Sequence, residues 1–463
     1  MMKGVARLAN QPVFNRTLTL LPVVLFGLAY MAPMTVFSTY GVAAQASHGM
    51  LPAAYLVALV AMMFTAYSYG QMVKAFPVAG SAYTYTQKSI NPHLGFLVGW
   101  VVLTDYLFLP MINFLVAGIY LSVAFPSVPT WIWILAFIAA ITAINLLGIK
   151  LTTKINALLI TYQFIVIVLF VILSIKGIAG GMGTGTFFSA QPFYDPEVSF
   201  AYVLAGSAIL CLSFLGFDSV TTLSEETIDA KKTLPKAVSL IALIGGCLFI
   251  LVSYVGNRVF PDYSSFSDPD SAAFEIARYI GGTLFSSLFL AGMIVLCFAS
   301  ALSSHASVSR LLYAMGRDSV LPSKIFGQLH PKYKTPMYNI IIVGIFSLSA
   351  LFIDLVTAAS FINFGALVAF TFVNLSVIFH FFLRQKKRSP KETIRYLLLP
   401  LIGSLFTIWL WTNLNLHSLL LGVIWGAFGL VYLMYLTNLF RKNPPEMKLD
   451  DTESSASSDV TTT

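Results

Sequence analysis

Long apolar stretches recur along the whole chain and are separated by short polar connections. A run of about eighteen apolar residues is long enough to cross the hydrocarbon core of a bilayer as an α-helix. Twelve stretches reach this length, so we expect an all-α integral membrane domain of twelve transmembrane helices over 18–440. The expected helices are 18–45, 51–75, 94–124, 130–147, 155–178, 198–222, 236–260, 282–315, 337–355, 360–383, 394–413 and 416–440.

Composition supports the same class. The chain has 463 residues, of which 57% are hydrophobic and 10% are charged, and its mean hydropathy is +0.82. Soluble domains carry about 25% charged residues, so a soluble protein is excluded. The first apolar run is too long for a signal peptide and contains Pro33, which favours an uncleaved first helix. We expect a cytoplasmic segment over 1–17 and a disordered cytoplasmic tail over 441–463, where the sequence becomes polar and acidic.

The net charge of +8 indicates membrane topology rather than a binding surface. With both termini placed in the cytoplasm, only Lys176, Arg258 and Arg278 of the 27 Lys and Arg residues face outward. This asymmetry follows the positive-inside rule and predicts that both termini are cytoplasmic. The expected surroundings are therefore a lipid bilayer, and no nucleic-acid partner is expected.

Two of the expected helices contain a helix-breaking residue. Pro33 removes a backbone donor from the first helix and clashes with its preceding turn. Gly216 interrupts the sixth helix beside Asp218. The breaks are five helices apart, an odd offset that inverts the second half of the chain relative to the first. Paired breaks point to a substrate site in inverted-repeat transporters, although each one alone is also compatible with an ordinary kink.

Asp218 is the strongest candidate for substrate binding. An acid at a bilayer centre costs about 2.5 kcal/mol or more, so it is rarely without a role. At a helix break its carboxylate could accept hydrogen bonds from an ammonium group. The alternative is that Asp218 satisfies neighbouring donors such as Ser219 and Thr221.

Asp105 and Tyr106 are further candidates in the third helix, where Pro110 follows. The Tyr106 phenol offers both a hydrogen bond and a π face to a cation. Adjacent helical residues point about 100° apart, so we expect only one of the two to face a substrate. The other would then stabilise helix packing.

Three further groups suggest gating or coupling. Glu225 and Glu226 lie at the expected cytoplasmic end of the sixth helix, where they could close an inner gate by pairing with Arg310 or Arg317. Alternatively, they are solvated charges whose ion pairs contribute little. His305 could couple transport to protons, but a neutral packing role is the favoured interpretation.

The motifs give no support to an enzyme or a channel. The sequence contains no GxxxxGK[ST] loop for phosphate and no HExxH zinc motif. Cys211, Cys247 and Cys297 are an odd number of cysteines within apolar stretches, so neither a disulfide nor a metal site is expected. We therefore expect no cofactor, no metal and no enzymatic activity, and no repeated filter sequence suggests a channel.

Three long motifs resemble signatures of the amino acid–polyamine–organocation superfamily. FPVAGSAYTYTQKSINPHLGFLVGW is similar to its helix 2–3 signature, SFLGFDSVTTLSEET to its helix 6 signature, and SRLLYAMGRDSVLPSKIFGQLHPKYKTP to its helix 8–9 loop. The resemblance covers about 18–440. Segments such as DYLFLPMIN and SSHASVSRLLYAMGRD are most similar to the bacterial putrescine importers.

The resemblance implies a five-plus-five inverted repeat with two extra C-terminal helices, proton-driven uptake and alternating access. It also implies which residues form the unwound helix segments and one aromatic contact with the substrate. Carried over residue by residue, these are Pro33, Met34, Thr35, Gly216, Phe217, Asp218 and Tyr106.

The chain departs from the resemblance at three positions. Met34 and its neighbours replace a Gly-x-Gly run that binds the substrate carboxylate in many amino acid members, which favours an amine without a carboxylate. Gln163 stands where some amino acid members have a coupling lysine. Ser38 stands where the putrescine importers have aspartate, which removes one partner for a second ammonium group unless Asp105 or aromatic faces substitute.

The leading hypothesis is a proton-coupled importer of putrescine or a related small amine in a bacterial cytoplasmic membrane. Asp218 would bind an ammonium group, and Tyr106 and Phe217 would contact the alkyl chain. The alternatives are an amino acid permease of the same fold and a non-transporting amine sensor, and the sequence contains no signalling domain for the latter.

Overall fold

The computed structural model describes residues 17–77, 81–148, 153–224, 227–317, 319–333, 335–414 and 416–445. Within these ranges all regular structure is helical, apart from one isolated bridge between Leu18 and Thr227. Among the described residues, ten helices are long and apolar enough to cross a membrane, and two shorter apolar helices cover Thr130–Leu146 and Met337–Leu351. The predicted all-α class is confirmed. The predicted terminal segments fall largely on 1–16 and 446–463, which lie outside the described residues.

The helices coincide with the predicted apolar stretches. The first half of the chain forms α2 (Leu20–Tyr30), η1 (Pro33–Phe37), α3 (Tyr40–Ala46), α4 (Leu51–Ala75), α5 (Ser81–Ser89), α6 (Pro92–Ala124), α7 (Thr130–Leu146) and α8 (Thr153–Ala179). The second half forms α9 (Phe200–Phe214), η2 (Ser219–Leu223), α10 (Ala230–Val259), η3 (Pro269–Ser271), α11 (Ala272–Arg317), α12 (Ser323–Phe326), α13 (Met337–Ser347), η4 (Leu348–Leu351), α14 (Leu355–Val377), η5 (Ile378–Arg384), α15 (Pro390–Thr393), η6 (Ile394–Leu398), α16 (Leu399–Thr412) and α17 (Leu416–Leu436).

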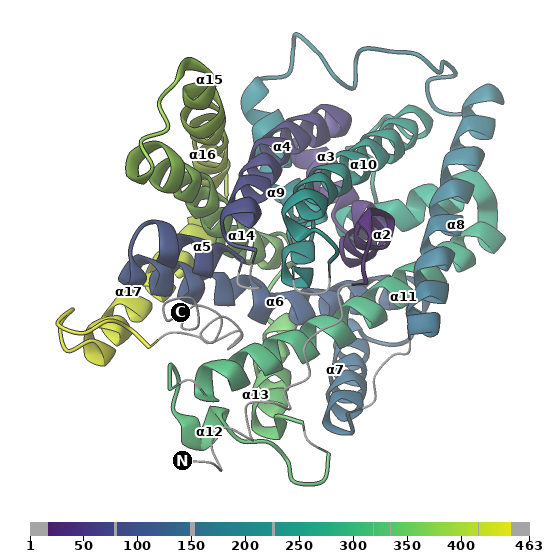
Figure 1. Cartoon of the computed structure of the whole chain (residues 1–463). Coiled ribbons are helices and arrows are strands. Elements are labelled where there is room, and N and C mark those ends of the chain that lie inside the picture. The colour runs from purple at the N-terminus through teal and green to yellow at the C-terminus, as the bar shows by residue number, and fades with distance from the viewer. Residues whose placement is uncertain are drawn as a thin grey trace.

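The bundle is built around α6, which crosses its centre (Figure 1) and packs against α11 and α14. α4 lies along α10 and also contacts α9. The most apolar window of α6 is 72% buried, and so is that of the segment formed by α9 and η2, whereas the corresponding window of α17 is 17% buried. The third and sixth predicted helices therefore form the interior, where a substrate site would be enclosed.

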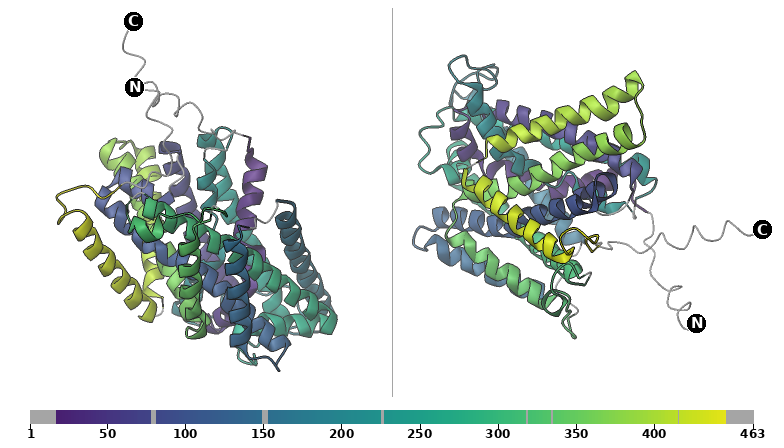
Figure 2. Two further views of the ribbon diagram at one scale, coloured as in Figure 1. Left: turned by 90° about the horizontal axis from the view of Figure 1, so that it is seen from below. Right: turned by 90° about the vertical axis from the view of Figure 1, so that its left-hand side faces the viewer.

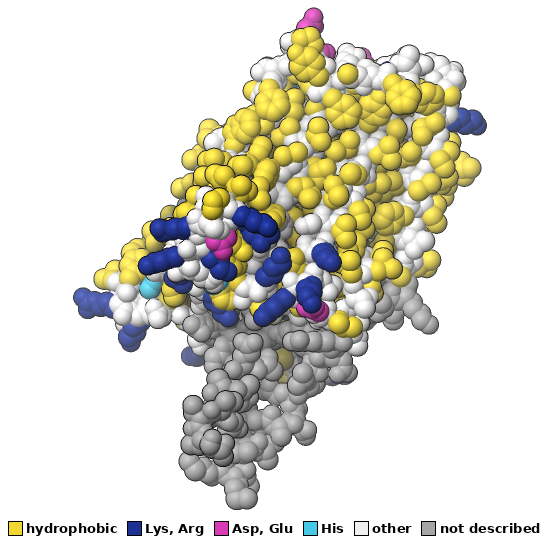
Figure 3. Space-filling model, turned by 45° about the horizontal axis from the view of Figure 1, so that its top comes forward, with side chains coloured by type: hydrophobic (Ala, Val, Ile, Leu, Met, Phe, Trp, Pro, Cys, Tyr) yellow, Lys and Arg dark blue, Asp and Glu magenta, His cyan; other side chains and the backbone are white. Residues whose placement is uncertain are grey.

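The outer surface is typical of a protein surrounded by lipid. Hydrophobic side chains cover a broad belt, and Lys and Arg side chains gather at one end of it (Figure 3). Side chains such as Leu158 (68% exposed) and Val431 (60% exposed) are strongly exposed although they are apolar. Apolar surface on this scale is stable where lipid rather than water is the solvent.

The first part of α11 is a short helix that precedes the predicted stretch 282–315. It follows η3 and ends at Gly282, whose φ of 61° and ψ of −158° break the helix before it continues to Arg317. Only glycine adopts such a conformation at little cost. The short helix and η3 pack against α3, so they cover one end of the first broken helix.

α17 lies at one edge of the bundle (Figure 2) and is held to α6 by a pair of tryptophans. Trp100 Nε1 donates to the carbonyl oxygen of Trp425 at 3.0 Å, and Trp425 Nε1 donates to that of Trp100 at 2.9 Å. The rings stack with centroids 5.1 Å apart. Gly429 lets the Trp100 ring lie directly on the helix backbone, because a methyl group there would overlap that ring.

We expect Gly429→Ala to lower the melting temperature of the detergent-solubilised protein by several degrees. The added methyl group forces the Trp100 ring away from α17, and overpacking of this kind costs about 1–3 kcal/mol. Gly426→Ala is the matched control, since a methyl group there meets only Val101 at 3.8 Å. Equal melting temperatures for the two variants would contradict this account of the contact.

Candidate functional site

The first predicted break is present between α2 and η1. α2 ends at Tyr30, and Ala32 has a φ of 50° and a ψ of 94°, outside the helical region. Pro33 explains the position, because proline disfavours a helical conformation in the residue before it. The Thr35 hydroxyl donates to the carbonyl oxygens of Met31 at 3.0 Å and Ala32 at 2.6 Å. It thereby supplies a donor to the Met31 carbonyl oxygen at the break and a second donor to that of Ala32, which also accepts from the Thr35 amide at 2.8 Å.

The second predicted break follows α9, which ends at Phe214. Gly216 has a φ of 105°, a conformation that side chains with a Cβ rarely adopt. The glycine also makes room for the first break, because a methyl group at this position would overlap the Tyr30 ring. The two broken helices therefore meet where Tyr30 packs against the bare backbone of Gly216.

Asp218 lies just after this break and is half-buried. The hydroxyl group of Tyr69, from α4, donates to Asp218 Oδ2 at 3.1 Å. The Tyr69 ring makes edge contacts with Phe217 at 5.9 Å and Phe370 at 6.1 Å between centroids. An aromatic wall thus orients one carboxylate oxygen of Asp218.

Asp105 and Tyr106 lie near Asp218. Asp105 is close enough to Asp218 for the two carboxylates to interact electrostatically. Asp105 packs over Gly365 of α14, where a methyl group would come within 3.2 Å of its Cβ. Tyr106 is also within electrostatic range of both carboxylates and of Tyr30. We call Asp105 and Asp218 the acidic pair. Asp105 and Tyr106, which are adjacent in α6, both interact electrostatically with Asp218.

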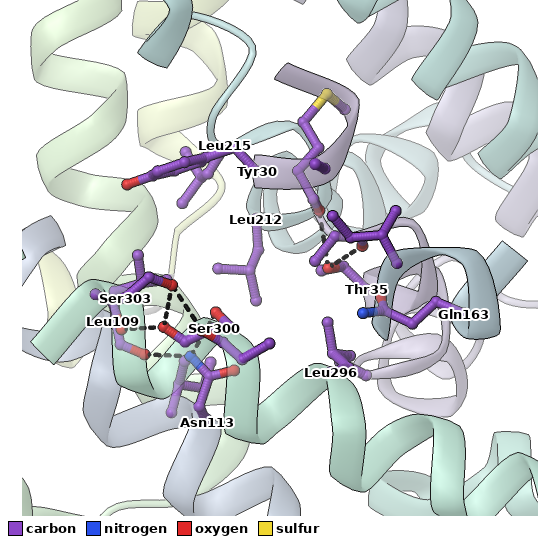
Figure 4. Close-up of a pocket in the computed structure, with 18 of the residues that line it drawn as sticks. Tyr30, Thr35, Leu109, Asn113, Gln163, Leu212, Leu215, Leu296, Ser300 and Ser303 are labelled. Carbon is purple, nitrogen blue, oxygen red and sulfur yellow. Dashed lines mark hydrogen bonds between the residues drawn. The ribbon is translucent and has the colours of Figure 1, made fainter. Parts of the chain in front are cut away.

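A cavity of about 310 Å³ opens beside the two breaks (Figure 4). Six elements, α2, η1, α6, α8, α9 and α11, contribute to its wall. The residues around it are Phe26, Ala29, Tyr30, Met31, Ala32, Thr35, Ser38, Leu109, Ile112, Asn113, Val116, Ile160, Gln163, Leu212, Leu215, Leu296, Ala299, Ser300, Ser303, Ser304 and Ser307. None of these side chains is charged.

The predicted substrate residues divide into three groups in the structure. Thr35 and Ser38 line the cavity. Pro33, Met34, Gly216 and Phe217 are buried and are not part of its wall, with Met34 and Phe217 fully buried. The acidic pair lies outside the wall of this cavity, and Tyr30 connects the two regions, because it lines the cavity and interacts electrostatically with both carboxylates. Tyr30 is 38% exposed, so part of its side chain is accessible from outside the packed helices.

Sequence reasoning missed several polar residues at this site. Asn113 Nδ2 donates to Ser300 Oγ at 3.0 Å, which joins α6 to α11 across the floor of the cavity. Tyr30, Tyr69 and Gln163 were also not selected as site residues. The sequence signal for these residues was an amide or phenol inside an apolar helix. Many such groups occur in the chain, so only their contacts in the folded structure distinguish the site residues from the others.

The predicted gate residues are only partly described. Glu225 and Glu226 lie outside the described residues. Arg310 and Arg317 are exposed on α11, and Arg310 follows the cavity residue Ser303 by about two helical turns on the same face. Pairing with the glutamates stays a prediction.

His305 is fully buried between α11 and α7. Its Nδ1 lies 3.4 Å from the amide nitrogen of Asn145, and it is not among the residues around the cavity. This position fits the packing interpretation. A role in proton coupling stays a prediction.

The chain is similar to known membrane permeases over most of its length. A family model described as amino acid permease matches residues 23–437. The chain belongs to the amino acid permease family. It is 47% identical over 433 residues to the low-affinity putrescine importer PlaP of Escherichia coli K12, which covers 93% of this chain and 96% of the importer.

More distant permeases align over similar lengths. The methylthioribose transporter of Bacillus subtilis is 28% identical over 446 residues, covering 91% of this chain and 93% of the transporter. The branched-chain amino acid permease BcaP of the same organism is 26% identical over 460 residues, covering 93% of this chain and 95% of the permease. The family thus accommodates relatives named for chemically different solutes.

We expect Gly216→Ala to destabilise the protein, both through its backbone strain and through overlap with the Tyr30 ring. Backbone strain of this kind costs about 1–3 kcal/mol. Adding Tyr30→Ala should recover part of the lost melting temperature, because it removes the atoms that the new methyl group meets. Thermal unfolding of both single variants and the double variant measures this coupling. Strictly additive effects would mean that the two breaks do not depend on each other.

Proposed function

We propose that this permease imports putrescine or a closely related small amine. The observation that carries the proposal is the acidic pair, Asp105 and Asp218, which lies beside the two breaks in a chain 47% identical to a putrescine importer. Two carboxylates close together in a site of low dielectric constant repel each other. A cationic amine offsets this repulsion, and its ammonium protons supply donors for the carboxylate oxygens.

Asp218 binds the first ammonium group in this proposal. Tyr69 already holds one of its oxygens through a hydrogen bond, which limits the carboxylate to few orientations. Tyr106 would contact the cation and the alkyl chain, a role supported by its electrostatic interaction with both carboxylates. The buried Phe217 ring packs against Tyr69 in the aromatic wall beside Asp218. Asp105 adds negative charge to the same region.

An amino acid permease is the second candidate function. The similarity to the branched-chain amino acid permease BcaP favours it, at 26% identity. An amino acid would bring its own carboxylate toward the acidic pair, and the break at Pro33 and Met34 lacks a glycine run to bind that group. The like charges and the missing glycines therefore favour an amine.

The transport cycle is proposed to follow from the paired breaks. The five-helix offset between them supports an inverted repeat of five helices each, followed by two extra helices at the C-terminus. Ten apolar helices of spanning length and two shorter ones support twelve crossings, and the basic end of the bundle supports cytoplasmic termini in a bacterial cytoplasmic membrane. Rocking of the broken helices would expose the site alternately to the two sides, with the proton gradient as driving force.

Uptake into proteoliposomes tests the proposal directly. We expect saturable entry of radiolabelled putrescine under an imposed proton gradient, with inhibition by other amines and little inhibition by amino acids. Uptake that is insensitive to the gradient would remove proton coupling. Absence of putrescine uptake, together with uptake of labelled amino acids, would favour the second candidate function.

We expect Asp218→Asn to abolish putrescine uptake, because a neutral amide gives up the charge that attracts the ammonium group. Asp229→Asn is the matched control, since Asp229 forms a surface ion pair with Lys232 at 2.9 Å, away from the cavity wall. Both variants should be present in the membrane at wild-type amounts. Wild-type uptake by Asp218→Asn would show that the ammonium group binds elsewhere.

Tyr69→Phe should raise the KM for putrescine about fivefold to tenfold with a smaller change in the maximal rate. The substitution removes the hydroxyl that donates to Asp218 but keeps the ring contacts with Phe217 and Phe370. A hydrogen bond to a charged group contributes about 1.5–3 kcal/mol, part of which a water molecule would replace. An unchanged KM would indicate that this hydrogen bond does not position the carboxylate for substrate.

A further inference from the structure

The carboxamide of Gln163 is an unusual group in the cavity wall. Gln163 belongs to α8, is 2% exposed, and lines the cavity. Figure 4 shows its amide end pointing into the cavity toward Thr35 and Leu296. Within the described part of the chain, its Oε1 atom has no hydrogen-bond partner. The side chain therefore ends at the cavity, and its carboxamide oxygen is buried without a hydrogen-bond donor.

The other carboxamide of the cavity shows the contrast. Asn113 Nδ2 donates to the carbonyl oxygen of Leu109 at 2.7 Å and to Ser300 Oγ at 3.0 Å, so its amide is fixed by α6 and α11. Gln163 instead has apolar neighbours on its own helix, including Ile160 in the cavity wall and the fully buried Val166. A buried acceptor without a donor is unfavourable, and a bound ligand with a free donor would offset that cost.

The charge distribution indicates which ligand group fits. Tyr30 lines the uncharged cavity and interacts electrostatically with both carboxylates of the acidic pair, which is not part of the cavity wall. A diamine whose first ammonium group binds Asp218 carries its second ammonium group several bonds away, where it also needs acceptors. An ammonium group has three donors and no acceptor, and hydrogen bonds from a charged donor are stronger than neutral ones.

We propose that Gln163 determines specificity for diamines by accepting a hydrogen bond from the second ammonium group of the substrate through Oε1. The terminal torsion of a glutamine side chain is broad, so the amide can turn its oxygen toward the cavity when an ammonium group enters. Thr35 and Ser300 provide further oxygen atoms on the same cavity wall. This inference rests on the proposed function, and it adds a second binding position that is neutral rather than acidic.

Binding of two amines that differ by one ammonium group tests the inference. Equilibrium binding of labelled putrescine to the purified full-length protein is measured in competition with unlabelled putrescine and with 1-aminobutane, which has the same carbon chain and one ammonium group. We expect Gln163→Met to weaken putrescine binding about tenfold and to leave 1-aminobutane binding nearly unchanged. We expect Gln163→Glu to strengthen putrescine binding relative to 1-aminobutane, because a carboxylate replaces a neutral acceptor.

The control variant is Thr161→Val on the same helix. Thr161 is exposed, its hydroxyl bonds the carbonyl oxygen of Ala157, and it is not part of the cavity wall, so the ratio of the two affinities should stay at the wild-type value. Equal weakening of both amines by Gln163→Met, or an unchanged ratio in Gln163→Glu, would make Gln163 a packing residue and overturn the inference. If Gln163→Met fails to fold, the ratio measured for Gln163→Glu decides alone. Failure of the wild-type protein to bind putrescine at all would instead reject the proposed function.

Discussion

The structure depends on one constraint, which is that backbone groups inside a membrane need protein partners because the hydrocarbon supplies none. Breaking two helices within the bundle creates several such groups. The Thr35 hydroxyl satisfies two carbonyl oxygens at the first break, and η1 and η2 restore short-range backbone bonds after each break. The breaks are therefore built features, and each one needs side chains from elsewhere in the bundle to be stable.

The same constraint explains why the breaks lie together. Gly216 has no side chain, so the Tyr30 ring of the first broken helix rests directly on the backbone of the second. Tyr30 also connects two chemically different regions, because it lines the uncharged cavity and interacts electrostatically with the acidic pair. A movement of either broken helix must change the contact with Tyr30, so the ring couples the helices that alternating access would move.

Much of the fold followed from the sequence because the membrane imposes simple rules. The length of apolar runs predicted every long helix, and Pro33 and Gly216 correctly predicted both breaks, since proline and a positive φ leave few alternatives. The site was predicted less completely. Asp218 was found because a charge in an apolar helix is rare, but its partner Tyr69 lies 149 residues earlier, and no local pattern connects the two.

The cavity wall shows most clearly why the rest could not be predicted. In the sequence, Gln163 stood out only because it replaces a lysine of related permeases. Its Oε1 atom has no hydrogen-bond partner in the cavity wall because no neighbouring helix brings a donor to it. Asn113 has similar chemistry and lies in a similarly apolar helix, yet its amide donates both to Leu109 of its own helix and to Ser300 of α11. The sequence shows which polar groups are present. Which of them lack a hydrogen-bond partner depends on how the helices pack across the bundle.

The charge asymmetry of the site also bears on release. A carboxylate at each end of a diamine would hold a doubly charged solute strongly in a medium of low dielectric constant, because each ion pair gains much more there than in water. Ser38 and Gln163 are neutral, so this chain concentrates its negative charge at Asp105 and Asp218. In the proposed function, the acidic end would bind the first ammonium group strongly, and the neutral end would bind the second ammonium group more weakly. A transporter needs this compromise, since a solute bound at both ends with full charge would leave slowly on the other side.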